Sequence, residues 1–459
     1  MKIGLLPLYI QLYDETSPEA RPRLESFYEE IIRLFSERNV EVEKSAFCRK
    51  KHEFANTIHA FEHAKVDAIV TLHMAYSPSL ESIEELSKTT LPIIVLDTTP
   101  TLEFTPQQDP GEVMFNHGVH GVMDMCSMLR RYGKEYAIVA GHYLESDCIN
   151  RACGYIKAAA AATALKHAKV GLIGGAFDGM GDFAVSPNEL SARFNICVET
   201  IDPKLLGQIN KTISVAEMEK ELAENQSYFD FSDNIVEEEY LDTVRSCIAL
   251  RKCIEKNGYT AFSVNFLSAG LDTGIHSMPF LECCKALERG IGYAGEGDAL
   301  TAAFTGAFLS AYPETNFVEI FCPDWKNNML FLSHMGETNY RIADCKPLIC
   351  RTGTNFTKGS PPYVGYTRMK AGGGVYVNIC RDKSNYRLFL AEAEMLSCDE
   401  DRFTQTMRGW MRPKNLSTAQ FLEEHSKMGA IHHSIFVYGA TVDELMFFGQ
   451  LLSMEIATV

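Results

Sequence analysis

The sequence predicts an α/β protein in which two doubly wound parallel-sheet domains are followed by a β-rich C-terminal domain. In the first third, short apolar runs rich in β-branched residues alternate with amphipathic helical patterns, which is typical of a parallel sheet with crossover helices. From about residue 328 the pattern changes to short strands with glycine-rich turns. With 459 residues, the chain is also too long for a single hydrophobic core.

The N-terminal domain is expected to span residues 1–168. A helix is predicted for Arg21–Arg38, where apolar residues recur at helical spacing. The apolar runs that predict strands are Ile3–Tyr9, Val66–Leu72, Ile93–Asp97 and Tyr136–Ala140. We therefore expect a parallel sheet of the flavodoxin or Rossmann type.

A second α/β domain of the same type is expected over residues 169–320. It opens with a predicted strand at Lys169–Gly174 and is then helical by pattern. The predicted helices are Ala216–Asn225, Glu237–Lys256 and Ser277–Arg289.

The C-terminal domain, residues 321–459, is expected to be barrel-like. A turn at three glycines precedes two strands, and a helix ends the chain. These elements are predicted at Gly372–Gly374, Val375–Ile379, Tyr386–Ala391 and Thr441–Met454. Thr441 can cap the helix, because Glu444 follows three residues later as in a capping box.

The composition restricts the partners and the location of the chain. A formal net charge of −17 repels nucleic acid and anionic membranes, so a neutral or cationic small-molecule partner is expected. The start of the chain lacks the apolar core of a signal peptide, and no apolar stretch approaches the ~20 residues that span a bilayer, so a cytoplasmic location is expected. The 14 cysteines lack CxxC spacing and are interpreted as buried or neutral thiols.

Three acidic residues are candidates for chemistry. Glu296 and Asp298 stand in a glycine-flanked turn before an alanine-rich helix, in GYAGEGDALTAAF. Both could simply cap this helix, because carboxylates are favoured in a first turn. Glu319 lies within the apolar run Phe317–Phe321, where a buried carboxylate needs a partner or a metal, although it could instead face solvent.

Three histidines are candidates as well. His334 follows the apolar run Met329–Leu332, where a core histidine is the alternative to a metal ligand. His432 and His433 lie in GAIHHSIF, and at most one of them is expected to enter a given site, because neighbouring strand residues face opposite ways. Two carboxylates and two imidazoles together form the mixed oxygen and nitrogen set that suits manganese, cobalt or iron.

The segments GYAGEGDALTAAF, NFVEIF, LFLSHMGET and GAIHHSIF resemble the L-arabinose isomerases. That family has two metal-binding glutamates and two metal-binding histidines there, in the same order. The resemblance implies a divalent metal ion, for which Mn²⁺ is expected and Co²⁺ or Fe²⁺ are the alternatives. The ligands that it implies are Glu296, Glu319, His334 and His433. It also implies that the two glutamates act as catalytic acid and base.

The resemblance implies an aldose–ketose isomerase that acts on a pentose or hexose such as L-arabinose through an enediolate. The alternative is a catalytically silent sugar-binding or regulatory relative. The likeness continues upstream in VDAIVTLHMAYSPS, NHGVHGVMDM and LIGGAFDGMGDF. A nucleotide-binding loop is an alternative for the last of these, but its glycines match neither GxGxxG nor the P-loop spacing.

The upstream likeness implies six substrate-binding residues, namely Gln11, His73, Tyr76, His120, Met180 and Phe183. In the family, the segment that contains His120 reaches the active site of a neighbouring subunit. A homotrimer or a dimer of trimers is therefore expected.

The chain departs from the family pattern beside both glutamates. Ala299 and Leu300 stand where the family commonly has an aromatic residue and a lysine. Ile320, Phe321 and Cys322 replace the acidic and aromatic residues that usually follow the second glutamate. We therefore expect the contacts near the substrate to differ from those of the family.

Overall fold

In the computed structural model, residues 1–459 are described except for 271, 354–356, 384 and 399. The chain forms two compact units, Met1–Ala160 and Ala161–Val459. The expected boundaries near residues 168 and 320 remain predictions. None of the helices in the described part of the chain is both long enough and apolar enough to cross a membrane.

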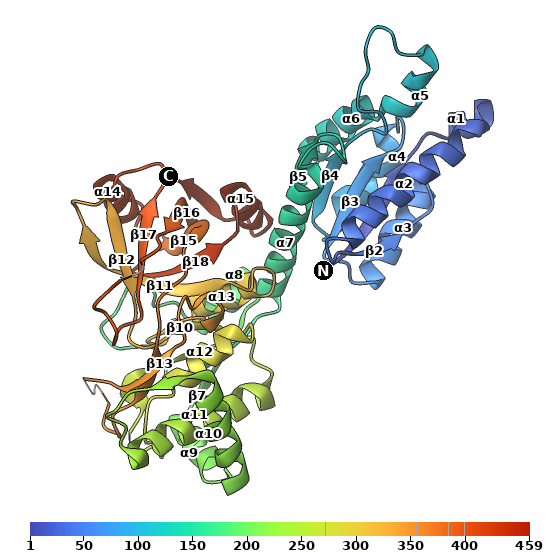
Figure 1. Ribbon diagram of the computed structural model, residues 1–459. Coiled ribbons are helices and arrows are strands. Elements are labelled where there is room, and N and C mark those ends of the chain that lie inside the picture. Colours follow the sequence, from blue (N-terminus) through green and yellow to red (C-terminus); the bar gives the residue numbers. More distant parts are fainter. Residues whose placement is uncertain (271, 354–356, 384, 399) are drawn as a thin grey trace. The chain divides into compact units, whose positions relative to one another are not determined.

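The first unit contains a five-stranded parallel sheet with the order β2-β1-β3-β4-β5 (Figure 1). This is the flavodoxin-like order of a doubly wound sheet, as predicted. The strands are β1 (Lys2–Leu8), β2 (Glu41–Lys44), β3 (Ala68–His73), β4 (Ile93–Asp97) and β5 (Tyr136–Ala140). The sequence did not predict the edge strand β2, because its four residues are mostly charged and form no apolar run.

Helices connect these strands. They are α1 (Gln11–Thr16), α2 (Arg21–Ser36), α3 (Lys51–His63), α4 (Ser79–Lys88), α5 (Val113–Asn116), α6 (Gly118–Arg131) and α7 (Cys148–Lys166), with short 3-10 turns at Pro18–Ala20 and Pro110–Glu112. Strand β3 is buried along its whole length, which explains its continuous apolar sequence.

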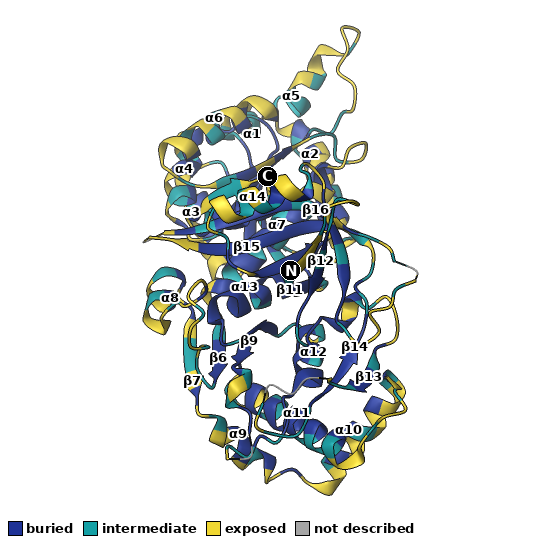
Figure 2. Cartoon of the chain, turned by 90° about the vertical axis from the view of Figure 1, so that its left-hand side faces the viewer, coloured by how far each residue is buried: buried dark blue, intermediate teal, exposed yellow. Residues whose placement is uncertain are grey.

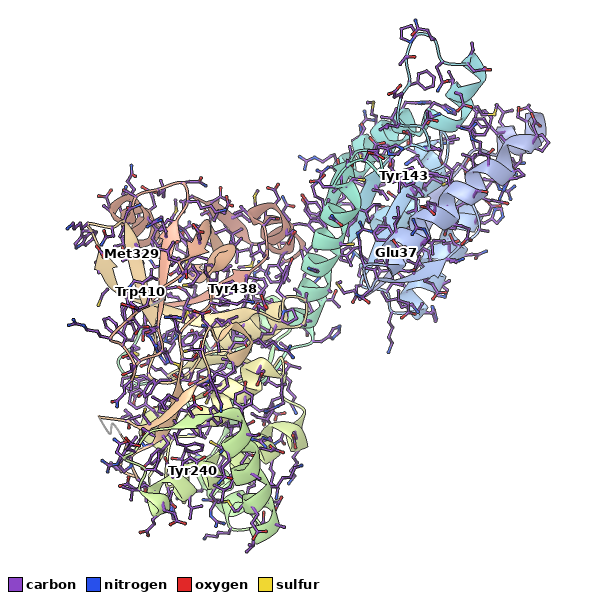
Figure 3. The ribbon with its side chains drawn as sticks, in the orientation of Figure 1. Glu37, Tyr143, Tyr240, Met329, Trp410 and Tyr438 are labelled. Carbon is purple, nitrogen blue, oxygen red and sulfur yellow. The ribbon has the colours of Figure 1, made fainter. Side chains whose placement is uncertain are left out.

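The second unit begins with a four-stranded parallel sheet of order β10-β9-β6-β7. Its strands are β6 (Lys169–Ile173), β7 (Cys197–Ile201), β9 (Ala261–Val264) and β10 (Gly292–Gly295). The accompanying helices are α8 (Pro187–Phe194), α9 (Pro203–Asn210), α10 (Val215–Tyr228), α11 (Glu237–Asn257), α12 (Phe280–Glu288) and α13 (Ala299–Leu309), with a 3-10 turn at Phe266–Ser268. Tyr240 of α11, labelled in Figure 3, packs edge-on against Tyr363.

The rest of the second unit is an antiparallel β-barrel of order β15-β18-β11-β12-β17-β16, closed by the pairing of β15 with β16. The strands are β11 (Thr315–Asp324), β12 (Met329–Ser333), β15 (Gly372–Asp382), β16 (Asn385–Met395), β17 (Gly409–Pro413) and β18 (His433–Tyr438), and β19 (Glu455–Thr458) adds in parallel to β16. These strands are largely buried (Figure 2). The predicted α/β class with a β-rich, barrel-like C-terminal part is confirmed.

Three further strands and two helices complete this part. A small sheet joins β8 (Asp230–Phe231), β13 (Leu348–Arg351) and β14 (Tyr363–Tyr366), a 3-10 turn lies at Tyr340–Ile342, and the helices are α14 (Thr418–Lys427) and α15 (Val442–Leu451). Thr441 caps α15 as predicted, since its hydroxyl accepts a hydrogen bond from Glu444 N.

The prediction of a turn at Gly372–Gly374 is wrong. All three glycines belong to β15 and pair with Glu394 and its neighbours on β16. A Cβ atom at Gly374 would lie 2.4 Å from the carbonyl oxygen of Val437, so the absence of a side chain permits the close approach of β15 to β18.

Candidate metal centre

Sheet register places the candidate ligands at one end of the barrel. Strand β11 lies between β12 and β18, and Glu319 pairs with Ser333 on one side and with His433 on the other. His334 directly follows β12, and Glu296 directly follows β10. The barrel and the parallel sheet of the second unit thus contribute to one site.

The donor atoms of these side chains face one another. His433 Nε2 lies 3.0 Å from Glu319 Oε1 and 3.4 Å from Glu296 Oε2. His334 Nε2 lies 3.2 Å from the same oxygen of Glu319. The structure therefore brings all four predicted ligands together.

Three of the donor atoms are buried without a hydrogen-bond partner among the described residues. They are Glu296 Oε2, Glu319 Oε1 and His433 Nε2. Such atoms are costly to bury, and a divalent cation between them would compensate all three. The residues present thus fit a metal ion with oxygen and nitrogen ligands.

His432 also reaches this site. Its Nε2 atom lies 3.6 Å from Glu296 Oε2, and its Nδ1 atom lies 2.6 Å from Asp182 Oδ2. The expectation that only one of the adjacent histidines could enter is wrong, because His432 precedes β18 and is not subject to strand alternation. His432 and His334 are therefore alternative second imidazoles. The ligand atoms that all lie within 4.8 Å of one another belong to Glu296, Glu319, His432 and His433.

Two buried carboxylates orient the histidines. His433 Nδ1 donates to Asp298 Oδ2 at 2.9 Å, and His334 Nδ1 donates to Glu337 Oε2 at 2.6 Å. Each bond leaves Nε2 as the ring nitrogen that faces the glutamates, as in metal-binding histidines of other proteins. Asp298 additionally caps α13 by accepting from Thr301 N, so the capping interpretation holds for Asp298.

The backbone around Glu296 is adapted to the site. Its φ angle of 63° lies in the left-handed region, which residues other than glycine rarely adopt. Where they do adopt it, the residue often lies at a functional site. A Cβ atom on the preceding Gly295 would lie 2.7 Å from His334 Cε1. The glycine at this position therefore allows the imidazole to approach the turn.

Two of the predicted substrate-binding residues lie beside the centre. Phe183 stacks on His433 with ring centroids 4.7 Å apart, and Met180 packs in the same small apolar cluster as Phe183. Phe317 contacts the rings of His433 and His334 edge-on, at centroid distances of 5.0 and 4.9 Å. These aromatic rings hold the imidazoles in place.

The electrostatics of the site favour a cation. Burial opposes the ionisation of Glu296, but His432 and His433 lower its pKa to about 2. Burial likewise opposes a charge on His334, but Glu337 and Glu319 raise its pKa to about 10. Protons and a divalent ion would compete for the same nitrogen and oxygen atoms.

The other predicted substrate-binding residues lie in the first unit. Gln11 is partly exposed and donates to Glu15. Tyr76 stacks on His120, with ring centroids 4.6 Å apart. His73 ends β3, and burial lowers its pKa to about 3, so its ring is neutral.

Several buried polar atoms near the carboxyl ends of the strands in the first unit lack a partner among the described residues. They are Tyr9 Oη, Thr71 Oγ1, both ring nitrogens of His73, Ser77 Oγ and Thr98 Oγ1. Doubly wound sheets bind their ligands at the carboxyl ends of the strands, where the connections that follow β1 and β3 leave toward opposite sides. Unpaired buried polar atoms are consistent with a ligand at this edge.

The sequence did not predict Glu337 or Asp182, and it indicated Asp298 as a candidate for chemistry with helix capping as the alternative. Glu337 and Asp182 lie within the segments LFLSHMGET and LIGGAFDGMGDF. A carboxylate three residues after a candidate ligand was the available signal for Glu337. Asp182 had no such signal, because its partner lies 250 residues away.

The chain is similar to known proteins over most of its length. Residues 178–310 match the L-arabinose isomerase central domain, and residues 314–455 match the L-arabinose isomerase C-terminal domain. The chain is 23% identical over 413 residues to the L-arabinose isomerase of Aeromonas salmonicida, covering 86% of this chain and 81% of the relative. It is also 23% identical to that of Yersinia pestis, covering 90% of this chain and 83% of the relative.

Together with the fold, these matches place the protein in the class of enzymes that interconvert aldose and ketose sugars. Within this class, the chain belongs to the L-arabinose isomerase family.

Proposed function

We propose that the chain is a metal-dependent isomerase that interconverts the aldose and ketose forms of a pentose or hexose such as L-arabinose. The convergence of two carboxylates and two imidazoles carries this proposal, because three of their buried donor atoms have no hydrogen-bond partner in the part of the chain that the structure describes. Mn²⁺ is the proposed ion, with Co²⁺ and Fe²⁺ as alternatives. The proposed location is the cytoplasm.

The proposed reaction moves a proton between two neighbouring carbon atoms of the sugar. When bound, the divalent ion would supply Lewis-acid stabilisation of negative charge on the substrate oxygens. Glu296 and Glu319 would remove the proton from C2 of the aldose and return a proton to C1, through an enediolate. His334 and His433 would be neutral donors, each held by its buried carboxylate.

We further propose that a second copy of the chain completes the site, in a homotrimer or a dimer of trimers. Two observations support a ligand-binding role for the first unit: the buried ring nitrogens of His73 have no partner among the described residues, and Tyr76 stacks on His120. The uncharged sugar substrate does not conflict with the acidic net charge of the chain.

Removal and return of the metal test this proposal. Protein treated with a chelator should not form ketose from L-arabinose, and Mn²⁺ should restore the reaction. In Glu319→Gln, kcat should fall by at least ~100-fold because the base is lost, while the circular dichroism spectrum is retained. Glu394→Gln, on the exposed side of β16, is the control and should keep full activity. Full activity of the chelated protein would refute the metal dependence.

A further inference from the structure

Tyr293 connects the parallel sheet of the second unit to the barrel side of the candidate metal centre. It lies on β10, just before Glu296, and its side chain is buried. Its hydroxyl donates a hydrogen bond to Glu337 Oε1. Because Glu337 in turn holds His334, the phenol reaches the centre through another side chain.

The two carboxylate oxygens of Glu337 have separate partners. Oε2 accepts from His334 Nδ1 at 2.6 Å and from Gly336 N at 2.8 Å. Among the described residues, the Tyr293 hydroxyl is the hydrogen-bond donor to Oε1. Glu337 is buried, and a buried carboxylate oxygen without a donor is costly. The phenol therefore fixes which oxygen of Glu337 faces the imidazole.

Aromatic packing fixes the phenol itself. The Tyr293 ring packs against Phe262 of β9, with centroids 5.2 Å apart, and edge-on against Phe317 of β11 at 6.0 Å. Side chains that are locked by packing can hold the geometry of a metal site closely. The hydroxyl of Tyr293 thus has a defined position from which to hold Glu337.

One short segment of the chain orients both imidazoles of the centre. Asp298, at its end, accepts a hydrogen bond from His433. Tyr293, at its start, holds the carboxylate that accepts from His334. Glu296 lies between the two. The positions of both rings relative to this glutamate therefore depend on the same turn.

We propose that Tyr293 is a positioning residue of the metal centre, which holds Glu337 so that His334 keeps its Nε2 atom directed at the ion. This inference rests on the proposed function, because that function places a divalent ion between the glutamates and the imidazoles. Loss of the hydroxyl would leave Oε1 buried without a donor, and the carboxylate would turn toward a new partner. His334 Nδ1 would then lose its acceptor, and the ring would no longer be oriented as a ligand.

Removal of the phenol oxygen tests the proposal. In Tyr293→Phe, the Mn²⁺ affinity of the full chain, measured by isothermal titration without sugar, should fall by about 10-fold, because partners that orient metal-binding histidines contribute at least that much. The visible absorption spectrum of the Co²⁺-loaded protein should change too, since it reports ligand geometry.

Tyr312→Phe is the matched control. Tyr312 is also buried and donates to a carboxylate, that of Glu444, at 2.9 Å. This variant loses the same kind of hydrogen bond and should keep both the Mn²⁺ affinity and the Co²⁺ spectrum. Unchanged Mn²⁺ affinity in Tyr293→Phe, or an equal loss in Tyr312→Phe, would overturn the assignment.

A double variant tests whether Tyr293 acts through Glu337. Glu337→Ala removes the carboxylate and should lower the Mn²⁺ affinity by more than Tyr293→Phe does. Adding Tyr293→Phe to Glu337→Ala should then change the affinity by less than about 2-fold, because residues that act through one contact are not additive. Full additivity of the two losses would overturn the assignment.

The outcomes separate this inference from the proposed function. A loss of Mn²⁺ affinity confined to Tyr293→Phe, in a protein that converts no sugar, would support the positioning role and overturn the isomerase function. Native protein that converts L-arabinose, with full Mn²⁺ affinity in Tyr293→Phe, would overturn only the positioning role. Native protein that binds no Mn²⁺ would overturn both the positioning role and the metal dependence.

Discussion

Asp298 links the start of a helix to the candidate metal centre. Its side chain is fully buried, and it accepts hydrogen bonds from Thr301 N and from His433 Nδ1. A carboxylate in this position fixes the imidazole and increases its basicity as a ligand. One residue thus serves both local folding and the proposed chemistry.

Replacement of Asp298 by asparagine should separate these two roles. The amide oxygen can still cap α13, but the amide nitrogen then faces His433 Nδ1 and cannot accept its hydrogen bond, so Mn²⁺ affinity should fall by ~10–100-fold. Isothermal titration of the metal measures this loss. Asp202→Asn is the control, because Asp202 caps α9 through Lys204 N. Equal Mn²⁺ affinity in the two variants would show that Asp298 does not support the metal centre.

Four of the site residues could be predicted from the sequence, and the others could not. The two glutamates and two histidines lie in motifs that could be compared with a family, and the structure brings them together. Strand alternation predicted that at most one of His432 and His433 would enter the site, although the strand begins only at His433. The pairing of His432 with Asp182 could not be predicted from local sequence patterns, because it depends on the tertiary structure.

Three helices of the second unit are joined by a buried ionic network. Arg251 of α11 binds Glu221 of α10 at 2.6 and 2.8 Å and also binds Glu282 of α12. Lys285 of α12 donates to Glu221 at 2.6 Å. Burial opposes the ionisation of Glu221, but Arg251 and Lys285 lower its pKa to about 2.

Glu221→Gln should destabilise the protein by about 3 kcal/mol at neutral pH, because the largely buried Arg251 and Lys285 each lose one ionised partner. A lowered pKa stabilises the fold above the ordinary value of 4.5, and this contribution is lost as pH falls from 4.5 toward about 2. The deficit, measured by urea unfolding, should therefore be smaller at about pH 4 than at neutral pH. Glu219→Gln, on the exposed face of α10, should have little effect. A deficit independent of pH would contradict this account.

Elements with a strong local pattern were predicted well. Ile93–Asp97 and Tyr136–Ala140 coincide with β4 and β5, because both are short apolar runs, although the edge strand β5 is only partly buried. The triglycine segment was misread, because its role is set by the approach of another strand. The pairing of β15 with β16 that closes the barrel also could not be predicted, since local sequence does not determine which strands become neighbours.

At the scale of the whole molecule, the proposed sharing of the active site between chains can be tested by complementation. His120→Ala alters the first unit and Glu319→Gln alters the second, so each variant alone should be nearly inactive. In mixed trimers, each site would draw one unit from each of two chains, and about one quarter of the sites would combine two native units. Co-expression of the variants should therefore restore about a quarter of native activity.

Two results would contradict the shared site. If the co-expressed variants stay as inactive as the separate ones, His120 and Glu319 of each active site come from the same chain. A native protein that is monomeric by light scattering and fully active would lead to the same conclusion.

The central claim is that this chain isomerises a sugar by proton transfer between the two glutamates and neighbouring carbons. The most direct test is the conversion of L-arabinose by the Mn²⁺-loaded protein in heavy water, followed by NMR of the ketose. Removal of the C2 proton by Glu296 or Glu319 and its return from a base that exchanges with solvent should place deuterium on C1 of the product. A ketose without deuterium at C1 would contradict proton transfer, and sugar that binds without conversion would contradict the isomerase function itself.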